Sequence, residues 1–289
     1  MVRKRAVRKQ QNTSRPLAQL GLTAAAFNAA VAQCVVEAEP DAVHHLRTGS
    51  RRLQAMLEAA LREGDSAANL LQQSAEAWLR PLKQTRRAAG PVRDLDVHRK
   101  LLERWLSASE PSPLRVQAEA LDHWIKDQRK QRAGRLQKQI SKRRQPLLER
   151  QSALFAAVDT LPAGPTQNAR LADLVALEAF VRAADAMPVL DVENLHDFRK
   201  ATKKARYVAE AGAEAKTQSS VARALKRIQD TIGDWHDWLC LAQEARAQDA
   251  PELTAELGHA VAKHFSIATR TTETMRGRLL GEWRAAKRP

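Results

Sequence analysis

No segment of this chain alternates apolar and polar residues with the period of two that a half-buried β-strand needs. Good helix formers dominate instead, chiefly Ala, Leu, Arg, Glu and Gln, while glycine supplies only 11 of the 289 residues and aromatic residues only 4%. A chain of this length with 44% hydrophobic residues is able to bury a core. We therefore predict a globular all-α fold.

Clusters of turn-forming residues divide the chain into roughly ten predicted helices. The clusters lie at residues 39–41, 63–66, 90–91, 111–113, 161–165, 187–188 and 249–251. We take the Pro- and Gly-rich stretch 161–165 as the boundary between two halves, residues 17–160 and 166–289. The basic residues 1–16 before them are predicted to form a flexible tail.

The basic start and the Ala-rich stretch 20–36 together imitate a secretory leader, but polar residues such as Asn28 and Gln33 interrupt the apolar run. No other stretch is long and apolar enough to cross a bilayer. Two cysteines, Cys34 and Cys240, are too few for a disulfide scaffold or a cysteine-based zinc site, and we expect both to pack among apolar neighbours. The sequence thus favours a cytoplasmic protein without a membrane partner.

Two motifs occur in the same order in both halves. Residues 43–53 align with residues 195–205 at an offset of 152, which preserves the histidine, the cation three positions later and the pair of cations seven and eight positions later. Residues 82–95 align with residues 225–238 at an offset of 143. The difference in offset falls between the motifs, where loops tolerate insertions. We infer an internal duplication and hence two four-helix-type bundles related by an approximate twofold axis.

Both copies of the first motif place a row of cations along one helix face, opposite an apolar face. The row consists of His44, Arg47, Arg51 and Arg62 in the first copy, and of His196, Arg199 and Lys203, with Arg206 at its edge, in the second. Cations about 5 Å apart repel one another, and only Glu58 and Glu210 are placed to compensate them. A linear polyanion such as inorganic polyphosphate would neutralise the rows. The alternative is an ordinary solvated face, which is unexpected in two copies held in register.

The following helices carry further cations, Arg80 and Lys83 in the first half and Arg223 and Lys226 in the second. We expect these cations to lie beside the two rows and to line one groove with them.

The motifs at residues 43–53, 92–97, 195–207 and 232–237 resemble those of the conserved-histidine α-helical (CHAD) domain family, and the resemblance extends over nearly the whole chain after about residue 17. It implies two related helical bundles around a basic central groove that binds inorganic polyphosphate. The binding residues that it implies are His44, Arg47, Arg51, Arg52, Lys83, His196, Arg199, Lys203, Lys204, Arg206 and Lys226. Gln54 and His236 depart from the family, which usually has a basic residue and often an Asn at these positions.

Asp94 and Asp96, with Asp237 in the repeat, have a spacing that also suits a hard cation. Because each follows a turn signal near a predicted helix start, we predict a structural role in which the carboxylates favour the helix dipole and orient Arg or His side chains. We predict no metal site and no cofactor. The remaining histidines are expected at the surface or in satisfied core positions; they include His98, His123, His259 and His264.

Eight basic residues and no acidic residue lie between Asp127 and Glu149. They are Arg129, Lys130, Arg132, Arg135, Lys138, Lys142, Arg143 and Arg144. Three functional interpretations of this segment are open: it extends the rows of anion-binding cations, contacts a second polyphosphate segment or contacts nucleic acid. The alternative is a solvated helix face, and the sequence does not decide among the four. The six Trp residues do not alternate with the cations as a base-stacking platform would, so we expect them in helix packing.

Non-catalytic binding of long-chain polyphosphate, with targeting to polyphosphate granules, is the function that these features favour. A hydrolase acting on polyphosphate or triphosphate generally needs metal-binding carboxylates or a nucleophile. The chain has neither a P-loop nor the Glu-x-Glu-x-Lys strand motif of the triphosphate-tunnel enzymes that often accompany the family. A nucleic-acid-binding protein is the other alternative, since the net charge is +15. The sequence does not determine the oligomeric state.

Overall fold

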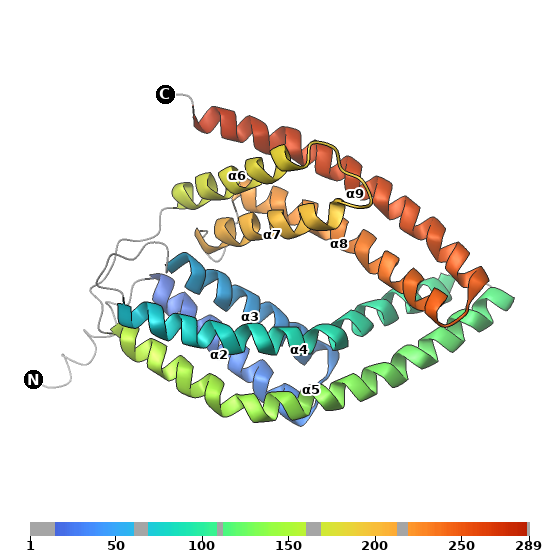
Figure 1. Ribbon diagram of the computed structural model, residues 1–289, viewed down its shortest axis with the longest axis horizontal. Coiled ribbons are helices and arrows are strands. Elements are labelled where there is room, and N and C mark those ends of the chain that lie inside the picture. The colour runs from blue at the N-terminus through green and yellow to red at the C-terminus, as the bar shows by residue number, and fades with distance from the viewer. Residues whose placement is uncertain (1–14, 61–68, 109–111, 160–168, 213–218, 288–289) are drawn as a thin grey trace, which may run out of the picture. The chain divides into compact units, whose positions relative to one another are not determined.

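The computed structural model describes residues 15–60, 69–108, 112–159, 169–212 and 219–287, and every regular element in these ranges is an α-helix (Figure 1). The described part of the chain contains eight helices: α2 (Arg15–Val36), α3 (Pro40–Ala60), α4 (Asn69–Ala108), α5 (Pro113–Asp159), α6 (Ala169–Ala186), α7 (Leu195–Gly212), α8 (Ser220–Ala247) and α9 (Pro251–Ala286). The predicted all-α fold is therefore confirmed, with longer helices than the sequence suggested.

Proline marks the start of α3, α5 and α9, at Pro40, Pro113 and Pro251. Its fixed φ suits the first turn of a helix, where its missing N–H would have no intrahelical partner anyway. The predicted breaks at 39–41, 112–113, 187–188 and 249–251 accordingly coincide with helix boundaries, and residue 111 lies outside the described residues. Those at 63–66 and 161–165 lie outside the described residues, as does most of the predicted tail 1–16.

The break predicted at Gly90–Pro91 is wrong, because α4 continues through this pair and also contains Pro81. An internal proline removes one helical hydrogen bond and crowds the preceding turn. Packing outweighs this cost, since Leu82 and Val92 on either side of the pair are at most 1% exposed. Burial of apolar side chains before and after the proline thus outweighs the preference of Gly90–Pro91 for a turn.

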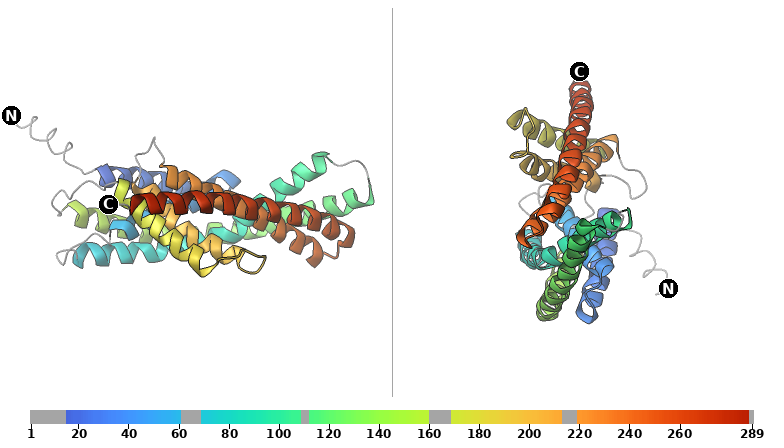
Figure 2. Two further views of the ribbon diagram at one scale, coloured as in Figure 1. Left: turned by 90° about the horizontal axis from the view of Figure 1, so that it is seen from above. Right: turned by 90° about the vertical axis from the view of Figure 1, so that its right-hand side faces the viewer.

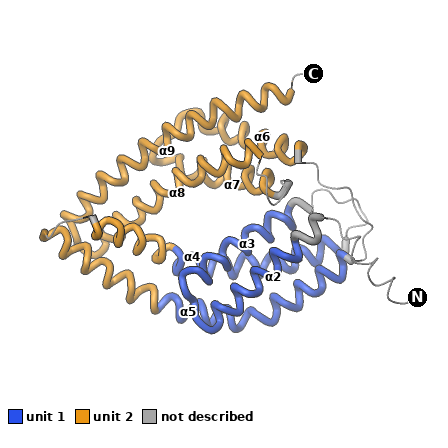
Figure 3. Tube along the Cα trace, turned by 180° about the vertical axis from the view of Figure 1, so that it is seen from behind, with its two compact units in different colours: residues 1–93, 131–167 blue, residues 94–130, 168–289 orange. Residues whose placement is uncertain are grey.

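The chain forms two compact units (Figure 3), each described here by itself. Unit 1 comprises residues 1–93 and 131–167, and unit 2 comprises residues 94–130 and 168–289. The described part of unit 1 is made of α2, α3, residues 69–93 of α4 and residues 131–159 of α5. The repeat boundaries 17–160 and 166–289 and the twofold relation stay predictions.

Unit 1 is held together by one core to which all four helical segments contribute. Phe27 of α2, Leu46 and Leu53 of α3, Trp78 of α4 and Leu136 of α5 are each at most 1% exposed in this core. Burial of the Leu46–Leu53 face directs the opposite face of α3, with its cations, towards solvent. The apolar face thus sets the orientation of the basic face.

Unit 2 contains two core clusters. Phe180, Phe198 and Trp235 belong to the cluster formed by α6, α7, α8 and α9. The second cluster joins residues 94–130 of α4 and α5 to α8 and α9, with Leu102 and Ile125 fully buried. Helices α8 and α9 pack against each other from the short turn that joins them (Figures 1 and 2). The predicted packing role of the Trp residues is confirmed, since Trp78 and Trp235 are at most 1% exposed.

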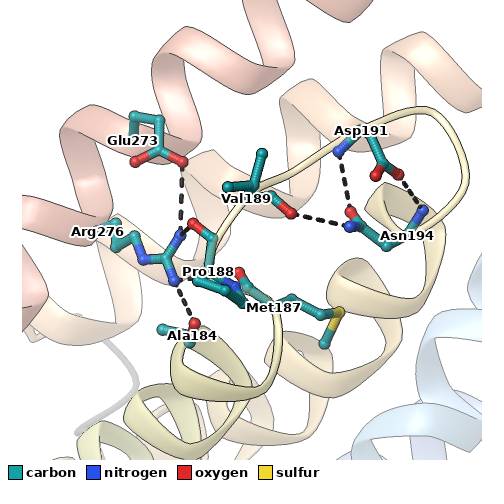
Figure 4. Close-up of polar contacts among 8 residues, drawn as sticks. All are labelled: Ala184, Met187, Pro188, Val189, Asp191, Asn194, Glu273 and Arg276. Carbon is teal, nitrogen blue, oxygen red and sulfur yellow. Dashed lines mark hydrogen bonds and ion pairs between the residues drawn. The ribbon is translucent and has the colours of Figure 1, made fainter.

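Arg276 of α9 holds the end of α6 (Figure 4). Its Nη1 donates a 2.9 Å hydrogen bond to the carbonyl of Pro188, and its Nη2 donates to the carbonyls of Met187 and Ala184. These oxygens belong to the last turn of α6 and the residues after it, where helical carbonyls lack intrahelical donors. One guanidinium group therefore caps the helix and fixes the chain that leaves it.

A second group of bonds shapes the connection from α6 to α7 (Figure 4). The backbone N–H of Asn194 donates to Asp191 Oδ1 at 2.8 Å, and the Asn194 side chain donates to the carbonyl of Val189 at 2.8 Å. These bonds close the turn that precedes Leu195, the first residue of α7. The turn and Arg276 together set where α7, and with it His196, begins.

We expect the Arg276→Met substitution to lower the free energy of unfolding by about 1–2 kcal/mol, because three carbonyls at the end of α6 lose charge-assisted donors while the apolar stem is kept. Urea denaturation should show a lower midpoint with an unchanged slope. The matched control is Arg278→Met on the same helix, since Arg278 is 49% exposed and pairs with Glu282 at the surface. Equal losses in the two variants would contradict the capping role of Arg276.

Candidate functional site

Helix α3 presents the first predicted row of cations. We define the α3 stripe as His44, Arg47, Arg51 and Arg52; His44 and Arg52 are exposed, and Arg47 and Arg51 are half-buried. Arg62, which the sequence placed on the same face, lies outside the described residues. Within unit 1 the stripe lies opposite the core face of α3, as the periodicity predicts.

Helix α7 presents the second row. We define the α7 stripe as His196, Arg199, Lys203 and Lys204; the first three are half-buried and Lys204 is exposed. Phe198 and Ala205 on the opposite face are completely buried in unit 2. The two helices therefore use the same division into an apolar face and a basic face.

The first arginine of each stripe lies against a glycine of the following long helix. In unit 1 a Cβ atom on Gly90 would lie 2.9 Å from Arg47 Nη1, and in unit 2 a Cβ atom on Gly233 would lie 3.2 Å from Arg199 Nη2. Only glycine leaves this space for the guanidinium group.

The same arginine–glycine contact recurs in each unit, between residues that the two motif alignments pair with each other, and this supports the inferred duplication. The alignments included both glycines, but no role was predicted for them. The sequence does contain a signal for this role, because a glycine recurs at the same position in both copies of the second motif.

Carboxylates pair with Lys83, Arg206 and Lys226 among the predicted binding residues. The pairs are Lys83–Glu58 at 3.5 Å, Arg206–Glu210 at 3.4 Å and Lys226–Asp230 at 2.5 Å. Lys83 and Lys226 are more than 40% exposed, and such surface pairs contribute only about 0–1 kcal/mol. Arg206 is only 18% exposed and also lies over the ring of Tyr207 at 4.8 Å, so it is held more firmly. Lys83 and Lys226 are thus easily released to an anion, whereas Arg206 is not.

Other members of the stripes keep their charge uncompensated. Within the described part of the chain, no carboxylate pairs with Arg51, Arg52 or Lys204. Gln54, which replaces the usual basic residue, accepts a hydrogen bond from Arg86 and donates one to Glu58 at 2.6 Å. In this chain, the Gln54 position links two charged neighbours instead of adding a cation.

His196 lies against His236 of α8, with ring centroids 4.6 Å apart. Burial, reinforced by Lys200 and Arg199, lowers the pKa of His196. Burial, reinforced by His196 and Arg199, lowers the pKa of His236 to about 4, so this ring is neutral at physiological pH. The Nδ1 atoms of both rings are buried without a hydrogen-bond partner among the described residues.

A polar cluster that the sequence did not single out lies further along α8. His98, from the α4 part of unit 2, is 4% exposed, and its Nδ1 lies 2.9 Å from Glu244 Oε2. Cys240 lies one turn before Glu244, with its Sγ atom 3.8 Å from His236 Nε2, so the expected apolar surroundings are wrong for this cysteine. Burial opposes the charged form of His98, but hydrogen bonds to Cys240 and Glu244 outweigh it and raise its pKa to about 9. The expectation of a satisfied core position is confirmed for His98, but spacing in sequence did not reveal its partners.

These two histidines give stability opposite dependences on pH. The folded pKa of His98, about 9, exceeds the usual 6.5, so its stabilisation is complete below pH 6.5 and is lost as the pH rises through 9. The folded pKa of His236, about 4, is below 6.5, so its stabilisation is present above pH 6.5 and is lost as the pH falls through 4.

We expect His98→Gln to lower the free energy of unfolding at pH 6.5, on the order of 2–3 kcal/mol, and to have much less effect above pH 9. Urea denaturation of both proteins across this range measures the difference. A deficit that stays constant from pH 6.5 to 9.5 would show that the charge of His98 does not stabilise the fold.

The aspartates near the second motif take part in local contacts. Asp96 is 3% exposed by its side chain and accepts a 2.8 Å hydrogen bond from Arg129 Nε. Burial raises the pKa of Asp237, although the nearby Arg199 opposes the shift. The predicted position near a helix start is wrong, because Asp94 and Asp96 lie inside α4 and Asp237 lies inside α8. Asp96 does bind an arginine, but one of the basic α5 segment and not of the stripes. The described residues include no group of three or more His, Cys, Asp or Glu side chains that is arranged to hold a metal ion.

The basic segment of α5 is mostly solvent-exposed. Arg129 is bound to Asp96, Arg132 donates to the carbonyl of Pro91 at 3.4 Å, and Arg143 donates to Gln139. Exposed cations make up the remainder: Lys130, Arg135, Lys138, Lys142 and Arg144. The alternatives raised for this segment therefore stay open.

The family profile of the CHAD domain matches residues 18–247, most of the chain. The chain belongs to the CHAD domain family. Among solved structures, the CHAD domain from the plant Ricinus communis has a TM-score of 0.62 and 19% identity, and the match covers 90% of this chain and 88% of that one. PptA from Streptomyces chartreusis has a TM-score of 0.51 and 16% identity, with 92% and 99% covered. At these identities the two structures show that the fold is shared.

No curated protein matches the chain. None of the described helices combines the length and the apolar character that crossing a bilayer requires.

Proposed function

We propose that this CHAD domain protein binds inorganic polyphosphate through the α3 and α7 stripes and does not hydrolyse it. The observation that carries the proposal is the repeated arginine–glycine contact, which positions a guanidinium group in the same way on each unit. A helix face that only contacts solvent does not require its arginines to be positioned. Membership of the CHAD domain family supports the same function. Binding of polyphosphate would in turn target the protein to polyphosphate granules.

The stripes match the chemistry of a phosphate polymer. Guanidinium groups of Arg47, Arg51 and Arg199 can each bind two phosphate oxygens, while Lys203 acts as a point charge. Neutral His196 can donate one ring N–H to a phosphate oxygen. Cations repeated at each helical turn suit a ligand that carries a charge every few ångströms. The side chains of the two stripes thus suit phosphate oxygens. Mg²⁺ would need oxygen ligands, which Arg, Lys and His side chains do not supply.

Affinity should rise with polyphosphate chain length and fall linearly with salt on logarithmic axes, because each bound phosphate releases counterions. A titration with polyphosphates of graded length at several salt concentrations measures both dependences. Tripolyphosphate should bind poorly, since it spans too few cations. Equal affinity for short and long chains would contradict binding along a row.

Two further measurements separate the alternatives. If double-stranded DNA displaces polyphosphate at equal phosphate concentration, the protein is a nucleic-acid binder. If phosphate is released in the presence of Mg²⁺ or Mn²⁺, the protein is a hydrolase. The proposal expects neither result.

A further inference from the structure

The cluster around Cys240 brings a thiol, two imidazoles and a carboxylate together inside unit 2. His236, Cys240 and Glu244 follow one another at intervals of four residues, and therefore share one face of α8. His98 approaches this face from α4 and hydrogen-bonds to both Glu244 and Cys240. The carboxylate orients the imidazole, and the imidazole contacts the thiol.

This order of groups is that of an activated nucleophile, in which a third group orients the base beside a cysteine or serine. With a pKa of about 9, His98 is an imidazolium at neutral pH. A thiol reacts as its thiolate, and a neighbouring imidazolium stabilises that anion. The other imidazole is His236, whose Nε2 lies 3.8 Å from the sulfur; it is neutral and adds no charge to the cluster.

Access distinguishes the two cysteines of the chain. Cys34 is completely buried in the core of unit 1, whereas Cys240 is partly exposed. Cys240 is therefore the cysteine of the two that lies nearer to solvent. Cys34 provides an internal reference for a thiol that is protected by packing.

We infer that Cys240 is a modification site, a nucleophilic thiol activated by His98 and Glu244 that reacts with small electrophiles and hydroperoxides. This inference does not depend on whether the stripes bind polyphosphate.

With hydrogen peroxide as the oxidant, the reaction balances within the cluster. The sulfur attacks one peroxide oxygen, the O–O bond breaks as the S–O bond forms, and the thiol proton replaces the one that His98 gives up. The leaving hydroxide takes the proton from His98 and departs as water. Sulfur loses two electrons to the peroxide, and the product is a sulfenic acid at Cys240.

Alkylation of the full-length folded protein by iodoacetamide tests the inference, with peptide mass mapping to follow each cysteine separately. At pH 6.5 we expect Cys240 to react about tenfold faster than N-acetylcysteine amide, a free thiol, and Cys34 to remain unmodified. Sulfenic acid formation with hydrogen peroxide, trapped by dimedone, should occur at Cys240 with the same preference.

Variants of His98 and Glu244 show whether Cys240 reacts because these groups activate it or only because it is exposed. His98→Gln should slow alkylation of Cys240 at pH 6.5 about tenfold, and Glu244→Gln should slow it by a smaller factor. Circular dichroism confirms that each variant is folded, and the pH profile of the unmutated protein decides the matter if neither folds. Unchanged rates in the folded variants, or a wild-type rate at pH 6.5 no higher than that of the free thiol, would overturn the assignment.

Discussion

The double variant Arg51→Glu and Lys203→Glu should bind long-chain polyphosphate at least about 100-fold more weakly than the unmutated protein, a loss of about 2.7 kcal/mol. One substitution lies in each stripe, and each replaces an attraction for phosphate by a repulsion. Both side chains are half-buried on the basic faces of α3 and α7 and contribute nothing to the cores behind them. Helicity by circular dichroism should therefore be retained. A titration at fixed salt concentration measures the affinity.

A matched control distinguishes a local effect from the change in net charge. Lys263→Glu and Arg270→Glu, both exposed on α9, alter the net charge by the same amount outside the stripes. This control should weaken binding only slightly, through long-range electrostatics that salt screens. If both double variants lose affinity equally, overall charge and not the stripes governs binding. Retained binding in the stripe variant would refute the proposed site.

The double variant Gly90→Ala and Gly233→Ala should lose affinity about tenfold while its thermal stability stays equal or rises. Alanine is favoured over glycine within a helix by about 0.5–1 kcal/mol. A Cβ at either position, however, would crowd Arg47 Nη1 or Arg199 Nη2, and the flexible guanidinium would yield by moving. Thermal denaturation and polyphosphate titration of the same protein measure the two effects separately.

The control for this pair is Gly258→Ala on α9. Gly258 is exposed, and a Cβ there would meet nothing within 4 Å. It should show the gain in helix stability without any change in affinity. Full affinity in the Gly90 and Gly233 variant would mean that the guanidinium positions over these glycines do not matter for binding.

Much of the candidate site was accessible to sequence reasoning because α3 and α7 are amphipathic. A period of 3.6 residues determines which side chains share a face, so His44, Arg47 and Arg51 could be grouped without coordinates. The ion pair of Lys226 with Asp230 joins residues four positions apart on one helix, so the same period predicts it. Contacts between helices, such as that of Arg47 with Gly90, have no such period.

The length of the helices was the least predictable feature of the fold. Gly90–Pro91 has the composition of a turn, yet it lies inside α4 because neighbouring apolar side chains are buried before and after it. His98 shows the same limitation for the site. Its partners, Glu244 and Cys240, are more than 140 residues away in sequence. Only the packing of α4 against α8 brings the three side chains together.

The sequence alone determined that the chain is helical, that two motifs recur in it, and that each recurrence places cations opposite an apolar face. These are local properties, since helix propensity and periodicity act within a few turns. Tertiary structure alone decided which arginine lies against which glycine, that Glu58 lies beside Lys83, and which histidine is charged. Those outcomes depend on burial and on side chains from distant helices, because desolvation and Coulomb interactions act through space and not along the chain.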